Sequence, residues 1–218
     1  MLLEQVQSQL ESIYDIGLKE RAEDFLIEKK EALSILNVKE ETKIPKELLL
    51  VRQPVDETVE VALFLDPKLF RNLSAHNLFE NISQKSLSDF CIVIEGVSHF
   101  VYYLWKSYRK VPITQLELEL QAEIDKFVML FLYLRTAQSG SGFSPSRIFE
   151  ALFENFTLLD HLSGTQKNRY MTASHLAGKF CYQLHQRFHS HQHLRVLLDE
   201  IRHFYNLTQE QKISYIMH

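Results

Sequence analysis

The sequence predicts a mainly α-helical fold of one domain, built around a central helical hairpin with one small β-hairpin packed on its side. Apolar residues recur at spacings of three and four along most of the 218 residues, as on the buried face of a helix. Residues 48–65 alternate instead with a period of two and are rich in β-formers. No long linker separates two cores, so residues 1–218 are expected to form a single domain.

Residues 1–45 are expected to contain two amphipathic helices. In the first helix Leu3, Val6 and Leu10 share one face. Gly17 follows at a place where helices often end with one residue in the left-handed conformation. The second helix is predicted over 22–36, where apolar residues keep the helical spacing and charged residues fill the other face.

Residues 48–65 are predicted to form the β-hairpin. Its strands would run over Leu48–Gln53 and Thr58–Leu65, joined by a turn at Pro54–Glu57. A two-stranded hairpin is marginal alone, so it must pack on the helices, and it leaves an edge open to a partner. We expect no other substantial β-structure, because no other segment shows this alternation.

Residues 67–136 are expected to supply the central helices. Ser86 and Asp89 have the spacing of a helix cap and predict a helix over 87–108. This helix is apolar almost all round near its C-terminal end, so several neighbours should cover it.

The second central helix is predicted over 114–136. Thr114 and Glu117 form a capping box at its start, which assigns the Glu117 side chain to the cap. Together the two helices make the central hairpin of the predicted core.

Residues 144–218 are predicted to form the C-terminal helices. The Gly- and Ser-rich loop at 139–143 before them marks only a minor internal boundary. A helix capped by Thr165 would run to about residue 189 and carry Ala173, Ala177 and Cys181 four positions apart. Such a stripe of small residues lets a neighbouring helix approach closely.

Composition and charge disfavour several functional classes. The longest apolar run, Phe127–Leu134, has eight residues and is too short to cross a bilayer. The N-terminus lacks the basic start of a signal peptide, and a net charge of −4 disfavours nucleic acid as a partner. Cys91 and Cys181 are expected to be buried thiols in a reducing compartment. We therefore expect a cytoplasmic protein without a membrane span.

The first candidate site is a set of polar residues on the two central helices: Glu95, His99, Glu119 and Glu123. Each pair is spaced four apart and so shares a helix face. Helical phase places Glu123 among apolar residues, where it should be buried and bonded to a Tyr, His or Arg from another helix. Carboxylates and an imidazole that meet between helices could bind a divalent metal ion.

A simpler interpretation assigns most of these residues to surface charge. Helical dimetal sites use Glu and His three positions apart, whereas Glu95 and His99 are four apart. Both also lie opposite the apolar stripe of their helix and on the side of Lys106, as solvent-facing residues do. The chain would then bind no metal stoichiometrically, and His99→Ala would change stability by less than about 0.5 kcal/mol.

The second candidate site is a histidine-rich tract in which His185, His189 and His193 lie four positions apart. This spacing is competent for metal ligands on one helix face. No glutamate follows the first two histidines as it does in zinc proteases. We interpret the tract as a polar helix end that would retain nickel adventitiously.

The predicted function is non-enzymatic protein interaction or regulation, in a homodimer or a complex and without a cofactor. Phosphate-binding loops, dinucleotide fingerprints and nucleophile elbows are absent from the sequence. The open hairpin edge and the aromatic residues Tyr102, Tyr103, Trp105 and Tyr108 would supply the interface. Two alternatives stay open: a metal-dependent or acid–base enzyme that uses the Glu/His set, and a protein that binds a small apolar ligand between its helices.

Overall fold

The computed structural model describes residues 2–39, 43–52, 59–74, 84–136, 144–154, 164–188 and 193–218. Most of these residues are helical, and the described strands form one two-stranded antiparallel sheet, which confirms the predicted fold class. The elements are α1 (Leu2–Tyr14), η1 (Ala22–Phe25), α2 (Lys29–Ile35), β1 (Glu47–Arg52), β2 (Glu60–Leu65), α3 (Pro67–Ser74), α4 (Gln84–Tyr108), α5 (Gln115–Thr136), α6 (Pro145–Phe149), η2 (Glu150–Glu154), α7 (Gly164–Arg187), α8 (Leu194–Asn206) and α9 (Gln209–Met217).

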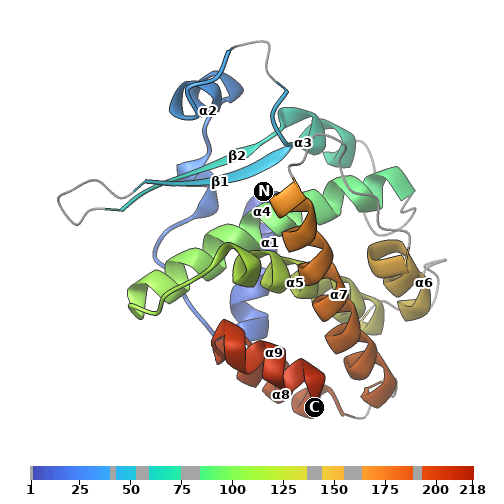
Figure 1. Cartoon of the computed structure of the whole chain (residues 1–218). Helices are drawn as coiled ribbons and strands as arrows, with labels where there is room; N and C mark the ends of the chain where they lie inside the picture. The colour runs from blue at the N-terminus through green and yellow to red at the C-terminus, as the bar shows by residue number, and fades with distance from the viewer. Residues whose placement is uncertain are drawn as a thin grey trace.

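Helices α4 and α5 lie side by side at the centre of the molecule, and α1 and α7 pack against them (Figure 1). The α7 helix packs against α5, and its residues Ala173, Ala177 and Cys181 are all fully buried. This confirms the predicted stripe of small residues. Buried apolar residues of α1 and of α3 through α9 belong to one continuous core.

The β-hairpin packs on the side of α4. In its register Glu47 lies opposite Leu65, and Arg52 lies opposite Glu60. In Figure 1 α4 lies below the hairpin and α2 lies above it. The predicted turn at Pro54–Glu57 lies outside the described residues. Among the described residues, β1 and β2 are the only substantial β-structure, as predicted.

The N-terminal region differs from the prediction at two places. The helix predicted over 22–36 is two short helices, η1 and α2, separated by an extended segment. The segment is extended because it pairs with β2: the Ile27 N–H donates to the Leu63 carbonyl at 2.9 Å. The predicted left-handed cap at Gly17 is also wrong, since Asp15 instead takes the positive φ of 54° after α1.

The caps of the central helices are partly as predicted. Ser86 and Asp89 lie inside α4 rather than at its start, because α4 begins at Gln84. The Asp89 carboxylate instead accepts hydrogen bonds from Lys46 at 3.0 Å and from Asn72 at 2.7 Å. It thereby fixes α4 to the hairpin and to α3.

The start of α5 confirms one half of the predicted capping box. The Glu117 N–H donates to the Thr114 hydroxyl at 3.1 Å. The Glu117 side chain does not complete the cap, since it accepts from Tyr102 and pairs with Lys106. The residue is buried, so these interior partners satisfy it in place of the cap.

The C-terminal helices follow the prediction with small shifts. The helix predicted from Thr165 is α7, which begins one residue earlier and ends at Arg187. Residue 189 and the loop at 139–143 lie outside the described residues. At α9 the predicted box is complete, because Thr208 and Gln211 each bond the other's backbone N–H.

Two expectations about exposure concern α4. By length and apolarity alone its segment Lys85–Tyr108 could span a membrane, but 72% of the most apolar window is buried inside the protein. A buried core helix passes the same test, so this is weak evidence for a span.

The expected aromatic interface is wrong for Tyr102, which is fully buried, while Tyr108 is exposed. Cys91 and Cys181 are buried free thiols, as predicted.

Candidate metal centre

Seven ionisable side chains from β1, α4, α5 and α7 meet beside the hairpin, and we call them the His99 cluster: Glu47, Glu95, His99, Glu119, Glu123, Lys126 and Arg169. The helical spacing brings four of them together, because each central helix contributes two residues one turn apart. The remaining three come from outside those pairs and were not singled out by the sequence pattern.

Gly96 brings the hairpin into the cluster. A Cβ atom added at this glycine would lie 2.8 Å from Glu47 Cγ and 2.9 Å from Leu65 Cδ2, closer than real Cβ atoms approach other atoms. The cross-strand pair Glu47 and Leu65 therefore rests directly on the backbone of α4. As a result the Glu47 carboxylate reaches the His99 ring one turn along.

Both nitrogens of the His99 imidazole face carboxylates, but only one of them lies within hydrogen-bond distance. Its Nδ1 lies 3.2 Å from Glu47 Oε1, and because a carboxylate accepts, Nδ1 donates this bond. Its Nε2 is buried without a hydrogen-bond partner and faces Glu119 Oε2 at 3.6 Å. The residue is only 7% exposed, so solvent does not readily satisfy this atom.

Two permanent cations border the cluster. The Lys126 ammonium lies 3.1 Å from Glu95 Oε2 and 2.7 Å from Glu123 Oε1. On the α7 side, Arg169 Nε lies 3.7 Å from Glu119 Oε1 and is buried without a hydrogen-bond partner. The cluster therefore sets four carboxylates against two permanent cations and one imidazole.

Burial and neighbouring charge act against each other in this cluster. Burial raises the pKa of Glu47 and of Glu123, although His99 and Lys126 respectively oppose the change. Burial would also raise the pKa of Glu95, but Lys126 and His99 outweigh it and lower that pKa. For His99 burial would lower the pKa, but Glu47 and Glu119 outweigh it and hold the pKa well above its usual value. The surplus of carboxylates thus competes for positive charge.

One atom each from Glu95, His99 and Glu119 lies within 4.8 Å of the other two, and in the described residues no other His, Cys, Asp or Glu group meets this condition. A cation could contact all three, since metal–ligand bonds of about 2 Å join atoms at such separations. Glu123 belongs to the same cluster but is held by Lys126.

The structure corrects the predicted exposure of these residues. His99 and Lys106 are buried and Glu95 is half-buried, so the solvent-facing strip is wrong. Helical phase identified the main apolar face of α4, but the hairpin and α5 cover a second face of the same helix. Glu123 is buried and hydrogen-bonded as predicted, although its partner is Lys126 of its own helix rather than a Tyr, His or Arg from a neighbour.

The histidine-rich tract does not converge on a site in the described part of the chain. His185 lies near the end of α7 and packs edge-on against Phe131, with ring centroids 6.1 Å apart. His193 precedes the first residue of α8. His189 lies outside the described residues, so the adventitious metal binding of this tract stays a prediction.

A second buried polar group lies between α1, α4, α5 and α9, and we call it the Lys212 network: Tyr14, Ser98, Tyr102, Lys106, Glu117, Gln121, Asp125 and Lys212. The fully buried Lys212 ammonium donates to Gln121 at 2.6 Å and to Tyr102 at 2.7 Å. The Asp125 carboxylate accepts from Tyr14, Ser98 and Gln121. Nothing in the sequence pattern connects residues so far apart.

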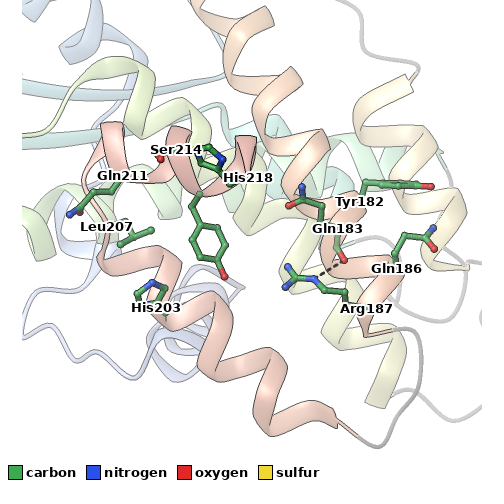
Figure 2. A pocket seen from close by; sticks show the side chains of 10 residues that line it. Tyr182, Gln183, Gln186, Arg187, His203, Leu207, Gln211, Ser214 and His218 are labelled. Carbon is green, nitrogen blue, oxygen red and sulfur yellow. Dashed lines mark hydrogen bonds between the residues drawn. The ribbon is translucent and has the colours of Figure 1, made fainter.

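A surface groove of about 730 Å³ lies between the end of α7 and helices α8 and α9 (Figure 2). His203, His218 and Arg187 lie around it, and the Arg187 guanidinium also pairs with Glu200. None of the residues that line the groove belongs to the His99 cluster. The binding of a small apolar ligand between helices stays a prediction.

Glu47, Lys126 and Arg169 are the cluster members that sequence reasoning missed. Lys126 lies three positions after Glu123 and could have been found as a helical ion pair. Glu47 and Arg169 carried no such local signal. No protein-family model, curated protein or solved structure matches this chain, so the assignment of the site rests on these distances.

Proposed function

We propose that this chain is a metal-binding protein that holds one divalent transition-metal ion between α4 and α5, with Glu95, His99 and Glu119 as ligands. The observation that carries the proposal is the His99 ring. Its Nδ1 is held by Glu47, and its buried Nε2 lacks a hydrogen-bond partner and faces Glu119. Histidines that bind metals in proteins typically use one nitrogen for the metal and give the other to a carboxylate or carbonyl.

The cost of the unpaired nitrogen supports this proposal. A buried polar atom without a partner costs about 1–3 kcal/mol, and such atoms are few in native proteins. His99 Nε2 and Arg169 Nε are two of them, and both face Glu119. A cation bound by Nε2 and by the carboxylates would give His99 Nε2 the partner that it lacks.

Charge and ligand type indicate the class of metal. A divalent ion would neutralise the excess of four carboxylates over two permanent cations. One imidazole and two carboxylates suit Zn²⁺, Mn²⁺ or Fe²⁺, while Ca²⁺ prefers oxygen ligands alone. Three protein ligands leave a position for water, as in catalytic metal sites, so metal-dependent hydrolysis is the enzymatic form of this proposal.

The test is metal analysis of protein purified without a histidine tag and without nickel. We expect about one equivalent of Zn²⁺, Mn²⁺ or Fe²⁺ after purification or after Zn²⁺ titration, and its loss in His99→Ala and Glu119→Gln. The matched control is His175→Ala, which removes an exposed histidine of α7 and should leave the stoichiometry at one. No binding by the parent protein, or equal binding by His99→Ala, would contradict the proposal.

We also propose a protein-interaction surface at the C-terminal end of α2. Three apolar residues close together in the chain, Ile35, Leu36 and Val38, are 53%, 39% and 40% exposed. An Ile35→Lys variant should reduce self-association or complex formation measured by light scattering after size exclusion. A parent protein that is monomeric and an unchanged variant would count against this role.

A further inference from the structure

We propose that the β-hairpin closes the metal site, so that cation binding and hairpin docking strengthen each other through Glu47. This inference rests on the proposed metal site and adds its regulation. Among the described residues, Glu47 is the one side chain of the hairpin that belongs to the His99 cluster. It is the first residue of β1, and its side chain is 11% exposed.

The contact between hairpin and helix is unusually direct. At Gly96 no side chain separates α4 from the cross-strand pair Glu47 and Leu65. A shift of the hairpin away from α4 therefore carries the Glu47 carboxylate away from His99, with no intervening layer to absorb the movement. Lys46, the residue before β1, adds a second anchor to α4 through Asp89.

A bound cation changes the bond between His99 and Glu47. When Nε2 releases its proton to solvent and coordinates a cation in its place, the Nδ1–H is a stronger donor to the carboxylate than that of a neutral imidazole. Glu47 in turn fixes the ring so that Nε2 faces Glu119. Glu47 is thus a positioning residue, and it acts on the metal only through His99.

Thermodynamic reciprocity makes this coupling measurable from both sides. If docking of the hairpin raises cation affinity by some factor, cation binding must favour docking by the same factor. Loss of a carboxylate behind a metal-bound histidine typically weakens metal affinity about 10- to 100-fold. We expect the coupling to lie in this range.

The experiment measures Zn²⁺ affinity and backbone amide exchange in parent protein, Glu47→Ala and Glu47→Gln. Zn²⁺ should bind Glu47→Ala about 10- to 100-fold more weakly than the parent. Glu47→Gln, whose amide oxygen can still accept from Nδ1, should recover part of the affinity. Zn²⁺ should slow exchange of β1 amides in the parent protein but not in Glu47→Ala.

The matched control is Glu60→Ala, in the same hairpin, which removes an exposed carboxylate paired with Arg52. It should keep parent Zn²⁺ affinity and the Zn²⁺-dependent protection of β1. Equal Zn²⁺ affinity in Glu47→Ala and parent, or equal protection with and without Zn²⁺, would overturn the coupling while leaving the metal site intact. Absence of Zn²⁺ binding by the parent protein would instead overturn the metal site itself, and the coupling with it.

Discussion

The His99 cluster and the Lys212 network lie between the same two helices but differ in how completely they are bonded. In the Lys212 network no buried side-chain atom lacks a partner among the described residues. In the His99 cluster two nitrogens, on His99 and Arg169, have no hydrogen bond and only a longer ion-pair contact with Glu119. A network whose polar atoms are all hydrogen-bonded can hold helices together by itself. A cluster whose polar atoms are not all hydrogen-bonded can gain stability from a bound ligand that contacts those atoms.

Charge balance shows the same contrast. The Lys212 network sets two carboxylates, Glu117 and Asp125, beside two amines, Lys106 and Lys212. The His99 cluster has four carboxylates for two permanent cations. The comparison teaches that polar residues of the same types on α4 and α5 are fully bonded and balanced in charge on one side, and incompletely bonded with excess negative charge on the other, which supports the proposed metal site there.

The largest effect on stability is expected when a carboxylate is removed from the Lys212 network. Glu117→Ala would leave the Lys106 ammonium, which is 1% exposed, without its counter-ion. We expect a loss of about 3–5 kcal/mol in the free energy of unfolding, measured in urea at neutral pH. Glu60→Ala, an exposed carboxylate, is the control, and a loss below about 1 kcal/mol would show that the network is not structural.

The next largest effect concerns how the free energy of unfolding depends on pH through the protonation of Lys212. Burial lowers the pKa of Lys212 from 10.5 to about 7, assisted by Lys106 and opposed by Glu117 and Asp125. Between these values the unfolded chain binds a proton that the folded chain does not, so stability should rise with pH by about 1.4 kcal/mol per unit.

Lys212→Met removes that dependence. Its stability relative to the parent protein should therefore be most favourable at pH 7 and below, and should become less favourable as the pH rises towards 10. Parallel urea titrations at several pH values would measure this, with Lys19→Met as the exposed control. A constant difference between Lys212→Met and parent would show that Lys212 keeps its proton when buried.

Metal addition tests the ligand-binding half of the comparison. At a free Zn²⁺ concentration about 100 times the dissociation constant, the parent protein should gain about 2.7 kcal/mol of stability. Glu117→Ala, if folded, should still gain from Zn²⁺, because Glu117 lies outside the His99 cluster. His99→Ala should gain no stability from Zn²⁺. Thermal unfolding of the parent protein and of both variants, with and without Zn²⁺, would measure these gains. An equal gain in His99→Ala would place the Zn²⁺ elsewhere.

The smallest expected effect is on metal-free protein. Glu119→Gln removes one of four carboxylates, but it also removes the charge that faces His99 at 3.6 Å and Arg169 at 3.7 Å. Because these two effects oppose each other, we expect the free energy of unfolding to change by less than about 1 kcal/mol, far less than for Glu117→Ala on the same helix. A loss above about 2 kcal/mol would mean that Glu119 has a structural role, like Glu117.

The sequence allowed local features to be predicted, and the structure confirms those that depend on one helix. The caps at Thr114 and Thr208, the burial of Glu123 and the small-residue stripe on α7 all follow from spacing within a single segment. The exposure of His99 was wrong because it depends on a hairpin 52 positions away. Helical phase cannot reveal a second covering surface that arrives from so distant a segment.

The Lys212 network has a consequence for the order in which this chain can fold. It joins Tyr14 to Asp125 across 111 positions and Tyr102 to Lys212 across 110 positions. During synthesis the interior between α4 and α5 therefore stays incompletely bonded until residue 212 has left the ribosome. Contacts between such distant segments slow folding, and partly folded chains expose surfaces that aggregate. A nascent chain that stops short of α9 should therefore depend on chaperones more than the finished protein does.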